Sequence, residues 1–289
     1  MKKILITGAN GQLGNSIKKL SSDFPQYSII YTDEKELDIT DLKATEAFFN
    51  LHSFDIAVNC AAYNAVDQAE ENIDIAERIN ALGPENLAKI TKLHQCSFIH
   101  VSTDYVFEGK GHRPYQETDT CIPPSAYGKS KLLGEEKVKI ANEKAMIIRT
   151  SWLYSEFGHN FMKTMLKYGL ERTELKVVYD QIGSPTYAND LARAILEILS
   201  GENFKFHNTL YHYSNEGVAS WYDFATEIIN AAQIDCKISP IESHEYPLPA
   251  PRPFYSVLNK AKIKKDFGLK IPHWRESMLA CLELLNEEK

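Results

Sequence analysis

Short apolar runs alternate with longer amphipathic stretches through the first half of the chain, and this alternation limits the possible folds more than any other feature. The runs cover residues 3–6, 28–31, 55–60, 97–101 and 145–148, and the stretches at 13–21, 42–51, 74–94 and 127–141 have helical spacing. Strands that are apolar nearly throughout are covered on both faces, as when helices cross over between parallel strands. The alternation predicts an α/β fold with a Rossmann-like, doubly wound parallel sheet.

The second half, after Trp152, has a looser pattern. It predicts helices at 160–170, 189–199 and 221–232 and strands at 175–179 and 211–214, and the alternating prolines between 247 and 253 predict an extended loop. A chain of 289 residues has room for one large domain and a smaller partner. We therefore predict a first domain over residues 1–150 and a smaller α/β lobe over 151–289 that returns some segments to the first.

Three glycines, Gly8, Gly11 and Gly14, follow the first predicted strand and open the first predicted helix. Glycines allow a tight turn there, and the N–H groups and positive dipole end of the helix face whatever binds, which suits a pyrophosphate. The Gly-x-x-Gly-x-x-Gly spacing is that of short-chain dehydrogenases. It predicts a dinucleotide site, with a ligand-free strand-to-helix turn as the alternative.

Asp33 ends the second predicted strand, where an acidic side chain can accept hydrogen bonds from ribose hydroxyls. A carboxylate facing a 2′-phosphate would be a like-charge contact, so Asp33 favours NAD over NADP. Lys35 is near enough in sequence to pair with a phosphate. The residues therefore leave both NADH and NADPH open as the cofactor.

Tyr127 and Lys131 are four residues apart in a predicted helix, so they share one face, and Thr103 lies at the end of the fourth predicted strand, where doubly wound sheets bind ligands. An ammonium about 6 Å from a phenol lowers the phenol pKa by about two units at an effective dielectric near 20. This predicts Tyr127 as a general acid. The alternative is a Tyr and a Lys on a solvated helix face. Tyr31 and Lys35 have the same spacing, but they lie at the end of a strand, where this spacing does not bring the side chains together.

Composition excludes several classes of protein. A net charge of −7 argues against a nucleic-acid-binding surface. The five cysteines are scattered, so neither a disulfide framework nor a cysteine zinc site is expected, and His207 and His212 lack the neighbouring carboxylates of a metal site. No apolar run is long enough to span a membrane, and no signal peptide is expected at the first residues. We expect a cytoplasmic protein.

Nine segments together resemble one family, the dTDP-4-dehydrorhamnose reductases, which are extended short-chain dehydrogenases acting on nucleotide sugars. The resemblance covers nearly the whole chain. Its segments are ITGANGQLG at 6–14, LDIT at 37–40, NCAAYNAVDQAE at 59–70, STDYVF at 102–107, YGKSK at 127–131, RTSWLY at 149–154, NF at 160–161, DQIGSPT at 180–186 and RP at 252–253. It implies NAD(P)H-dependent reduction of the C4 ketone of dTDP-4-dehydro-β-L-rhamnose to dTDP-β-L-rhamnose, for bacterial surface polysaccharide.

The resemblance also implies roles for individual residues. Tyr127 would protonate the C4 oxygen, Thr103 would hydrogen-bond it, and Lys131 would hold the nicotinamide ribose. Tyr127 and Lys131 would contact the cofactor together with the following residues: Gly8, Asn10, Gly11, Gln12, Leu13, Gly14, Asp33, Asp38, Ile39, Ala61, Ala62 and Tyr63. The sugar nucleotide would contact Thr103, Tyr127, Asp104, Trp152 and Arg252, with Arg252 as a partner for the dTDP diphosphate.

Two positions depart from the family pattern. Asn64 stands where the family often has Thr. Some members bind Mg²⁺ between subunits through carboxylates, one of them just after the glycine loop, where this chain has Asn15. Asp190 alone is a poor site for a cation that prefers several oxygen ligands. We expect catalysis without a metal and leave monomer and homodimer open.

Three other functions have to be weighed. A 4,6-dehydratase typically has Thr-Asp-Glu at the end of the fourth strand, whereas Tyr105 follows Asp104 here, so the base is missing. An epimerase also moves hydride at C4, and the Tyr-Lys pair alone does not reject it. A dinucleotide-binding regulatory subunit, like that of methionine adenosyltransferase, would not need Thr103, Tyr127 and Lys131 together.

Overall fold

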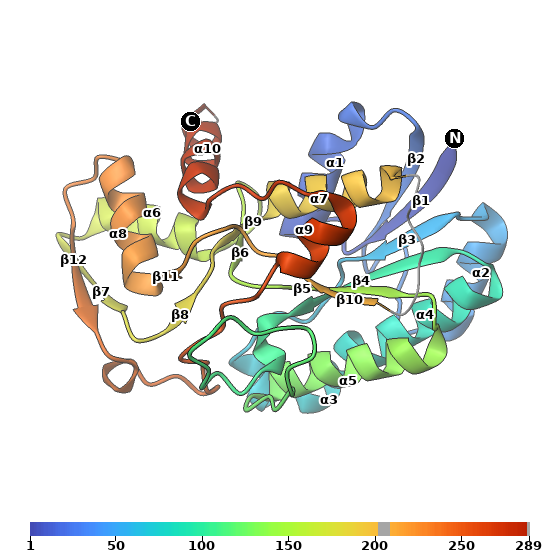
Figure 1. Cartoon of the computed structure of the whole chain (residues 1–289), viewed down its shortest axis with the longest axis horizontal. Helices are drawn as coiled ribbons and strands as arrows, with labels where there is room; N and C mark the ends of the chain where they lie inside the picture. Colours follow the sequence, from blue (N-terminus) through green and yellow to red (C-terminus); the bar gives the residue numbers. More distant parts are fainter. Residues whose placement is uncertain (202–208, 288–289) are drawn as a thin grey trace.

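A computed structural model describes residues 1–201 and 209–287, so His207 lies outside the described residues. The chain forms a larger lobe around a central sheet and a smaller lobe beside it (Figure 1). No helix among the described residues is both long and apolar enough to cross a membrane.

Six parallel strands form the central sheet. Their order is β10 (Thr209–His212), β5 (Met146–Thr150), β4 (Ser97–Thr103), β3 (Ile56–Asn59), β1 (Lys2–Thr7) and β2 (Tyr27–Thr32). The order reverses at β1, because β2 lies on one side of it and β3 on the other. Ligands bind such sheets at the carboxyl ends of the strands, next to this reversal. The predicted doubly wound α/β sheet is confirmed.

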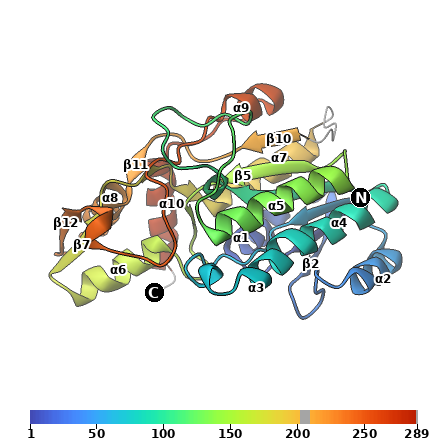
Figure 2. The same ribbon diagram turned by 90° about the horizontal axis from the view of Figure 1, so that it is seen from below.

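Helices cover both faces of the sheet, as the apolar strands required (Figure 2). Ile4 and Ile6 of β1 pack toward α1 (Gln12–Leu20) and α7 (Ala188–Ser200). Leu5, between them in the sequence, packs toward the other face with α2 (Leu42–His52), α4 (Gly83–Leu93) and α5 (Ala126–Ala141). Both alternating sets are fully buried, so each strand is held from two sides.

The smaller lobe has its own apolar core. Helices α6 (Phe161–Glu171), α8 (Trp221–Ala231) and α10 (Trp274–Glu287) pack around it, with the parallel pair β7 (Glu174–Val178) and β12 (Lys237–Ile241). Two short pairs connect it to the sheet lobe: β6 (Leu153–Tyr154) with β9 (Thr186–Tyr187), and β8 (Ile182–Gly183) with β11 (Ala219–Ser220). The proline segment 247–253 has neither helix nor strand, as predicted.

Several elements differ from the sequence predictions. The single helix expected over 74–94 is divided into α3 (Ile73–Glu77), a π-helical turn (Arg78–Leu82) and α4. Pro84 stands at the first turn of α4, because a proline inside a continuous helix would break its hydrogen bonds. The sequence did not predict α9 (Ala261–Phe267), α10 or β12. Both α7 and β10 follow residue 150 and still belong to the sheet lobe.

Candidate active site

The glycine loop turns where a side chain would collide with backbone. Gly8 has a φ of +66°, and a Cβ there would lie 2.5 Å from the Ala61 nitrogen. A Cβ on Gly14 would lie 2.5 Å from the Ala9 Cα, and Gly11 is the N-terminal cap of α1. Gly8 and Gly11 also line cavities at the start of α1, where the N–H groups of a helix suit an anionic ligand.

Asp33 holds this loop in place. Its Oδ2 accepts a hydrogen bond from the Asn10 backbone N–H at 2.9 Å, and its Oδ1 accepts one from the Glu34 N–H at 2.9 Å. From the sequence, this carboxylate is predicted to bind ribose hydroxyls and to favour NAD over NADP. The structure adds a second function, since Asp33 ties the end of β2 to the glycine loop.

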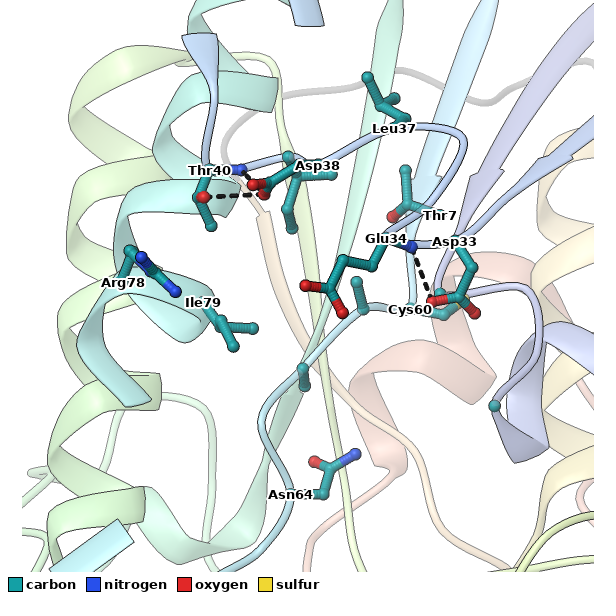
Figure 3. Close-up of a pocket in the computed structure, with 15 residues that line it drawn as sticks. Thr7, Asp33, Glu34, Leu37, Asp38, Thr40, Cys60, Asn64, Arg78 and Ile79 are labelled. Atoms are coloured by element: carbon teal, nitrogen blue, oxygen red, sulfur yellow. Dashed lines mark hydrogen bonds between the residues drawn. The ribbon is translucent and has the colours of Figure 1, made fainter. Parts of the chain in front are cut away.

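Next to Asp33, a cavity of about 250 Å³ extends past Asp38, Ile39 and Ala61 (Figure 3). One oxygen of the Asp38 carboxylate, Oδ1, accepts hydrogen bonds from the Thr40 backbone N–H and hydroxyl. Backbone and apolar atoms around Ile39 and Ala61 form much of the wall, which suits a flat base such as adenine.

A second cavity of about 570 Å³ joins the glycine loop to the ends of β4 and β5. It brings together the predicted catalytic residues Thr103, Tyr127 and Lys131 with Gly11, Gln12 and Leu13. Ala62 also lines it, while Tyr63 is held nearby through hydrogen bonds between its backbone and the Asn80 side chain.

Tyr127 lies in the first turn of α5, whose cap is Ser125; the Ser125 Oγ accepts the Gly128 N–H at 3.1 Å. The Tyr127 hydroxyl donates to Asn64 Oδ1 at 3.4 Å, so Asn64 contacts the predicted acid directly. Burial raises the pKa of Tyr127, and its neighbour Thr103 opposes that rise only in part. The expected lowering of this pKa by Lys131 is therefore wrong, because removal of the phenol from water outweighs the attraction of the ammonium.

Lys131 is almost completely buried, with 2% of its surface exposed. Its Nζ donates to the Val101 carbonyl oxygen of β4 at 2.8 Å. Burial lowers its pKa to about 8, against the opposing effect of Glu135. The side chain is thus fixed in the cavity and remains mostly protonated at neutral pH, and the alternative of a solvated helix face is wrong for this pair.

Thr103 and Asp104 follow one another where β4 ends. The Thr103 hydroxyl donates to Asp104 Oδ1 at 3.0 Å, and Asp104 Oδ2 is buried without a hydrogen-bond partner among the described residues. Burial raises the pKa of Asp104 to about 6, with the Ser256 and Thr103 hydroxyls opposing the shift. A buried oxygen without a partner at a cavity wall is ready to bind a polar ligand group.

Trp152 closes the cavity on the side of the smaller lobe. Its φ of +48° is unusual for a residue with a large side chain. Its indole stacks on that of Trp221, with ring centroids 3.6 Å apart and planes 6° apart. On Gly183, a Cβ would lie 2.5 Å from the Trp152 ring, so a glycine is needed there.

Arg252 lies apart from this cavity, in a third one of about 760 Å³ that is lined mostly by the smaller lobe. Its Nη2 forms an ion pair with Asp67 Oδ2 at 2.7 Å, and its Nη1 is buried without a hydrogen-bond partner among the described residues. Val66, Tyr105 and Trp221 line both cavities. A long ligand could therefore reach from Tyr127 to Arg252.

The whole described chain matches a known family. Residues 1–287 match the family model described as the RmlD substrate binding domain. The chain belongs to this family. Among its relatives are the spore coat polysaccharide biosynthesis protein SpsK of Bacillus subtilis, 41% identical with 98% of each chain covered, and a dTDP-4-dehydrorhamnose reductase of Aggregatibacter actinomycetemcomitans, 39% identical with 96% and 97% covered.

Solved structures agree with this family. A dTDP-4-dehydrorhamnose reductase from Clostridium acetobutylicum is 44% identical, with a TM-score of 0.93 over 98% of this chain and 99% of that one. One from Bacillus anthracis, in complex with NADP, is 39% identical, with a TM-score of 0.92 over 98% and 100%. A Thermus thermophilus UDP-glucose 4-epimerase at 16% identity shares only the fold.

The two residues considered above in connection with Mg²⁺, Asn15 and Asp190, have other contacts in this chain. Asn15 donates to the Asn10 and Gly11 carbonyl oxygens. Asp190 Oδ2 accepts hydrogen bonds from Asn215 Nδ2 and the Ser277 hydroxyl. Within residues 1–201 and 209–287, no three His, Cys, Asp or Glu residues gather as a metal site would require.

Three residues that the sequence analysis did not identify contribute to this region: Arg78 and Trp221 line the cavities, and Asn80 supports the Tyr63 backbone. Asn80, in the π-helical turn, bonds both backbone groups of Tyr63 and the Ser130 hydroxyl. Trp221 begins α8 and Arg78 faces the cavity beside Asp38. Only Asn80 had a signal, a polar residue just before Gly83 and Pro84 in an otherwise helical pattern; Trp221 and Arg78 depend on contacts between distant segments.

Proposed function

We propose that this chain reduces the C4 ketone of dTDP-4-dehydro-β-L-rhamnose to dTDP-β-L-rhamnose, with NADH or NADPH as the hydride donor. The observation that carries the proposal is the meeting of Thr103, Tyr127 and Lys131 in one cavity with the glycine loop. Family membership supports it, because relatives that cover nearly the whole chain are named dTDP-4-dehydrorhamnose reductase.

The glycine loop fits a dinucleotide, since Gly8 and Gly11 line both cavities at the N-terminal end of α1. Gly8, Asn10, Gly11, Gln12, Leu13 and Gly14 would surround the pyrophosphate. Asp33 would bind the adenosine ribose, Asp38 and Ile39 would border the adenine, and Ala61, Ala62 and Tyr63 would border the nicotinamide side. When bound, the reduced nicotinamide supplies the hydride.

Tyr127 would donate its proton to the C4 oxygen as hydride adds to C4. Its raised pKa keeps the phenol protonated at neutral pH, which is the form that a general acid needs. The Thr103 hydroxyl would bond the same oxygen. The Lys131 ammonium, fixed on Val101, would hold the nicotinamide ribose and stabilise the phenolate that remains until water returns the proton.

The sugar nucleotide would lie between the lobes. Asp104 Oδ2 would bind a sugar hydroxyl and Trp152 would shape the sugar pocket. Arg252, with its buried Nη1, would face the diphosphate, and the aromatic wall of Phe161 and Tyr168 would hold the base. We assign residues 1–150 to the dinucleotide lobe and 151–289 to the sugar-nucleotide lobe, with α7 and β10 returning to the sheet.

The dTDP sugar and the nicotinamide cofactor are metabolites of the cytoplasm, so we propose that compartment for the chain. We propose no nucleic-acid or membrane partner. The monomer and the homodimer both remain open, and sedimentation of the purified chain distinguishes them.

The test is a reductase assay with the purified chain, NADH or NADPH, and dTDP-4-dehydrorhamnose generated in the same reaction. We expect net oxidation of the cofactor with equal formation of dTDP-rhamnose, and at least tenfold slower turnover with a UDP-linked keto sugar. Binding of cofactor without any turnover would favour a regulatory subunit, and sugar isomerisation without net oxidation would favour an epimerase.

A further inference from the structure

The cavity beside Asp33 is acidic. Three carboxylates line it, those of Asp33, Glu34 and Asp38, and Arg78 is the single Lys or Arg among its described lining residues. Two of the carboxylates accept hydrogen bonds from the chain itself: each Asp33 oxygen accepts one, from the Asn10 and Glu34 N–H groups, and Asp38 Oδ1 accepts two from Thr40. Glu34 is different.

Figure 3 shows the Glu34 carboxylate pointing into the cavity, without a hydrogen bond to the other residues drawn. Its backbone is fixed, since the Glu34 N–H donates to Asp33 Oδ1. Its negative charge therefore faces any ligand group that lies beside Asp33. No residue drawn in Figure 3 hydrogen-bonds this carboxylate, so it can contact the ligand directly.

The end of β2 is where doubly wound folds bind the adenosine ribose, and Asp33 follows β2 directly. NADH has a 2′-hydroxyl there, which can donate a hydrogen bond to a carboxylate. NADPH has a 2′-phosphate, which like other phosphate monoesters carries a charge of about −1.5 to −2 at neutral pH. Beside Glu34 that phosphate meets a like charge in a partly enclosed site.

The cations that could compensate are poorly placed. Arg78 lies across the cavity, next to Thr40 and Ile79 and away from Asp33 (Figure 3). Lys35, which the sequence offered as a phosphate partner, is exposed and is not among the residues that line the cavity. A relative in the family is known in complex with NADP, so the choice depends on each chain's own residues at this place.

We propose that Glu34 makes this chain prefer NADH to NADPH. The inference rests on the proposed function only in taking this cavity as the adenosine end of the dinucleotide site. It assigns a specificity-determining role to a residue outside the catalytic cavity, and it leaves Asp33 to hold the glycine loop for both cofactors.

The experiment measures the Kd of NADH and of NADPH for the full chain without sugar, from the change in nicotinamide fluorescence. We expect NADPH to bind at least about tenfold more weakly than NADH. The ratio of the two Kd values, NADPH over NADH, should shrink as salt screens the charges. Glu34→Gln should lower the ratio at least threefold, mainly by tightening NADPH, and Glu34→Lys should bring it to one or reverse it.

Lys35→Gln is the matched control, a neighbouring charge change outside the cavity, and should leave the ratio unchanged. Equal affinities in the unaltered chain, or a Glu34→Gln ratio equal to that of the unaltered chain, would overturn the proposal. Because binding is measured without turnover, a chain with the expected ratios but no reductase activity would refute the proposed function and leave this inference standing.

Discussion

The two lobes supply their site residues in different ways. In the sheet lobe, Thr103 ends β4, Tyr127 and Lys131 share one face of α5, and the glycine loop joins β1 to α1. On the side of the smaller lobe, Trp152 lies in the connection between β5 and β6, and Arg252 lies in the proline segment. Regular elements position the first group, whereas contacts such as the Trp221 stack and the Asp67 ion pair position the second.

This difference indicates that the two lobes have different roles, which we call the division of labour between them. Under the proposed function, the sheet lobe would hold the reacting groups, which tolerate little displacement, on rigid elements. The smaller lobe would bind the sugar nucleotide with side chains that support each other. Changes in the first should act on turnover or cofactor binding, and changes in the second should act on sugar-nucleotide binding.

The largest effect is expected from Tyr127→Phe. Loss of the proton donor should lower kcat by about 10²-fold or more, since general acids contribute that much. The Kd of NADH should stay within about twofold, because the phenol adds little to cofactor affinity. Tyr179→Phe, at an exposed position outside the cavities, is the control. A Tyr127→Phe variant with near-normal kcat would refute the assignment of the acid.

Asp104, where the two lobes meet, gives a pH-dependent prediction. Its pKa is raised in the folded chain to about 6, so the folded state binds the proton more tightly than the unfolded state. Ionisation therefore destabilises the fold as pH rises from about 4 through 6. Asparagine has no charge to lose or gain. The difference in free energy of unfolding, Asp104→Asn minus the unaltered chain, should therefore be about 2 to 3 kcal/mol larger at pH 8 than at pH 4.

Urea unfolding of both chains at several pH values measures this change. A stability difference that does not vary with pH would show that Asp104 is not held in a water-poor site.

Two glycine substitutions test the division of labour directly. Gly14→Ala puts a methyl group against the Ala9 backbone and should weaken NADH binding about tenfold, whereas Gly183→Ala displaces Trp152 and should weaken dTDP binding about tenfold. Each should leave the other ligand's Kd nearly unchanged. Calorimetric titrations of both variants check this, with melting temperatures as a control for folding. Equal losses for both ligands in Gly183→Ala would break the comparison.

The smallest effect concerns a link between the lobes. The Gln12 side chain donates to the Leu153 carbonyl oxygen and accepts from Ser155 and Asn160, so it connects the glycine loop to the Trp152 side. Bound NADH should lower the Kd of dTDP. Gln12→Ala should make this gain in dTDP affinity about threefold smaller. Asn15→Ala, whose hydrogen bonds stay inside the glycine loop, should keep the gain. If both variants keep the full gain in dTDP affinity, Gln12 does not couple the two binding sites.

Much of the sheet lobe could be predicted from the sequence, because strand ends, helix spacing and glycine placement are local patterns. The positions of Thr103, Tyr127 and Lys131 follow from such patterns. The pKa of Tyr127 did not, since burial depends on the whole fold and outweighed the Lys131 charge.

The smaller lobe was harder to predict. Trp221 meets Trp152 only because β8 and β11 pair and bring α8 to the cavity. Arg252 carried a family resemblance, but its ion pair with Asp67 joins residues far apart in the sequence. The family resemblance of the DQIGSPT segment likewise gave no reason for Gly183, which the packing of Trp152 supplies.

The most direct test of the account follows a deuterium label. NADH deuterated at the transferred position of the nicotinamide is mixed with dTDP-4-dehydrorhamnose and the chain, and the sugar product is analysed by NMR. The account predicts dTDP-rhamnose with one deuterium at C4, formed in equal amount to the oxidised cofactor. A product without deuterium at C4, or isomerised sugar with the cofactor still reduced, would contradict it.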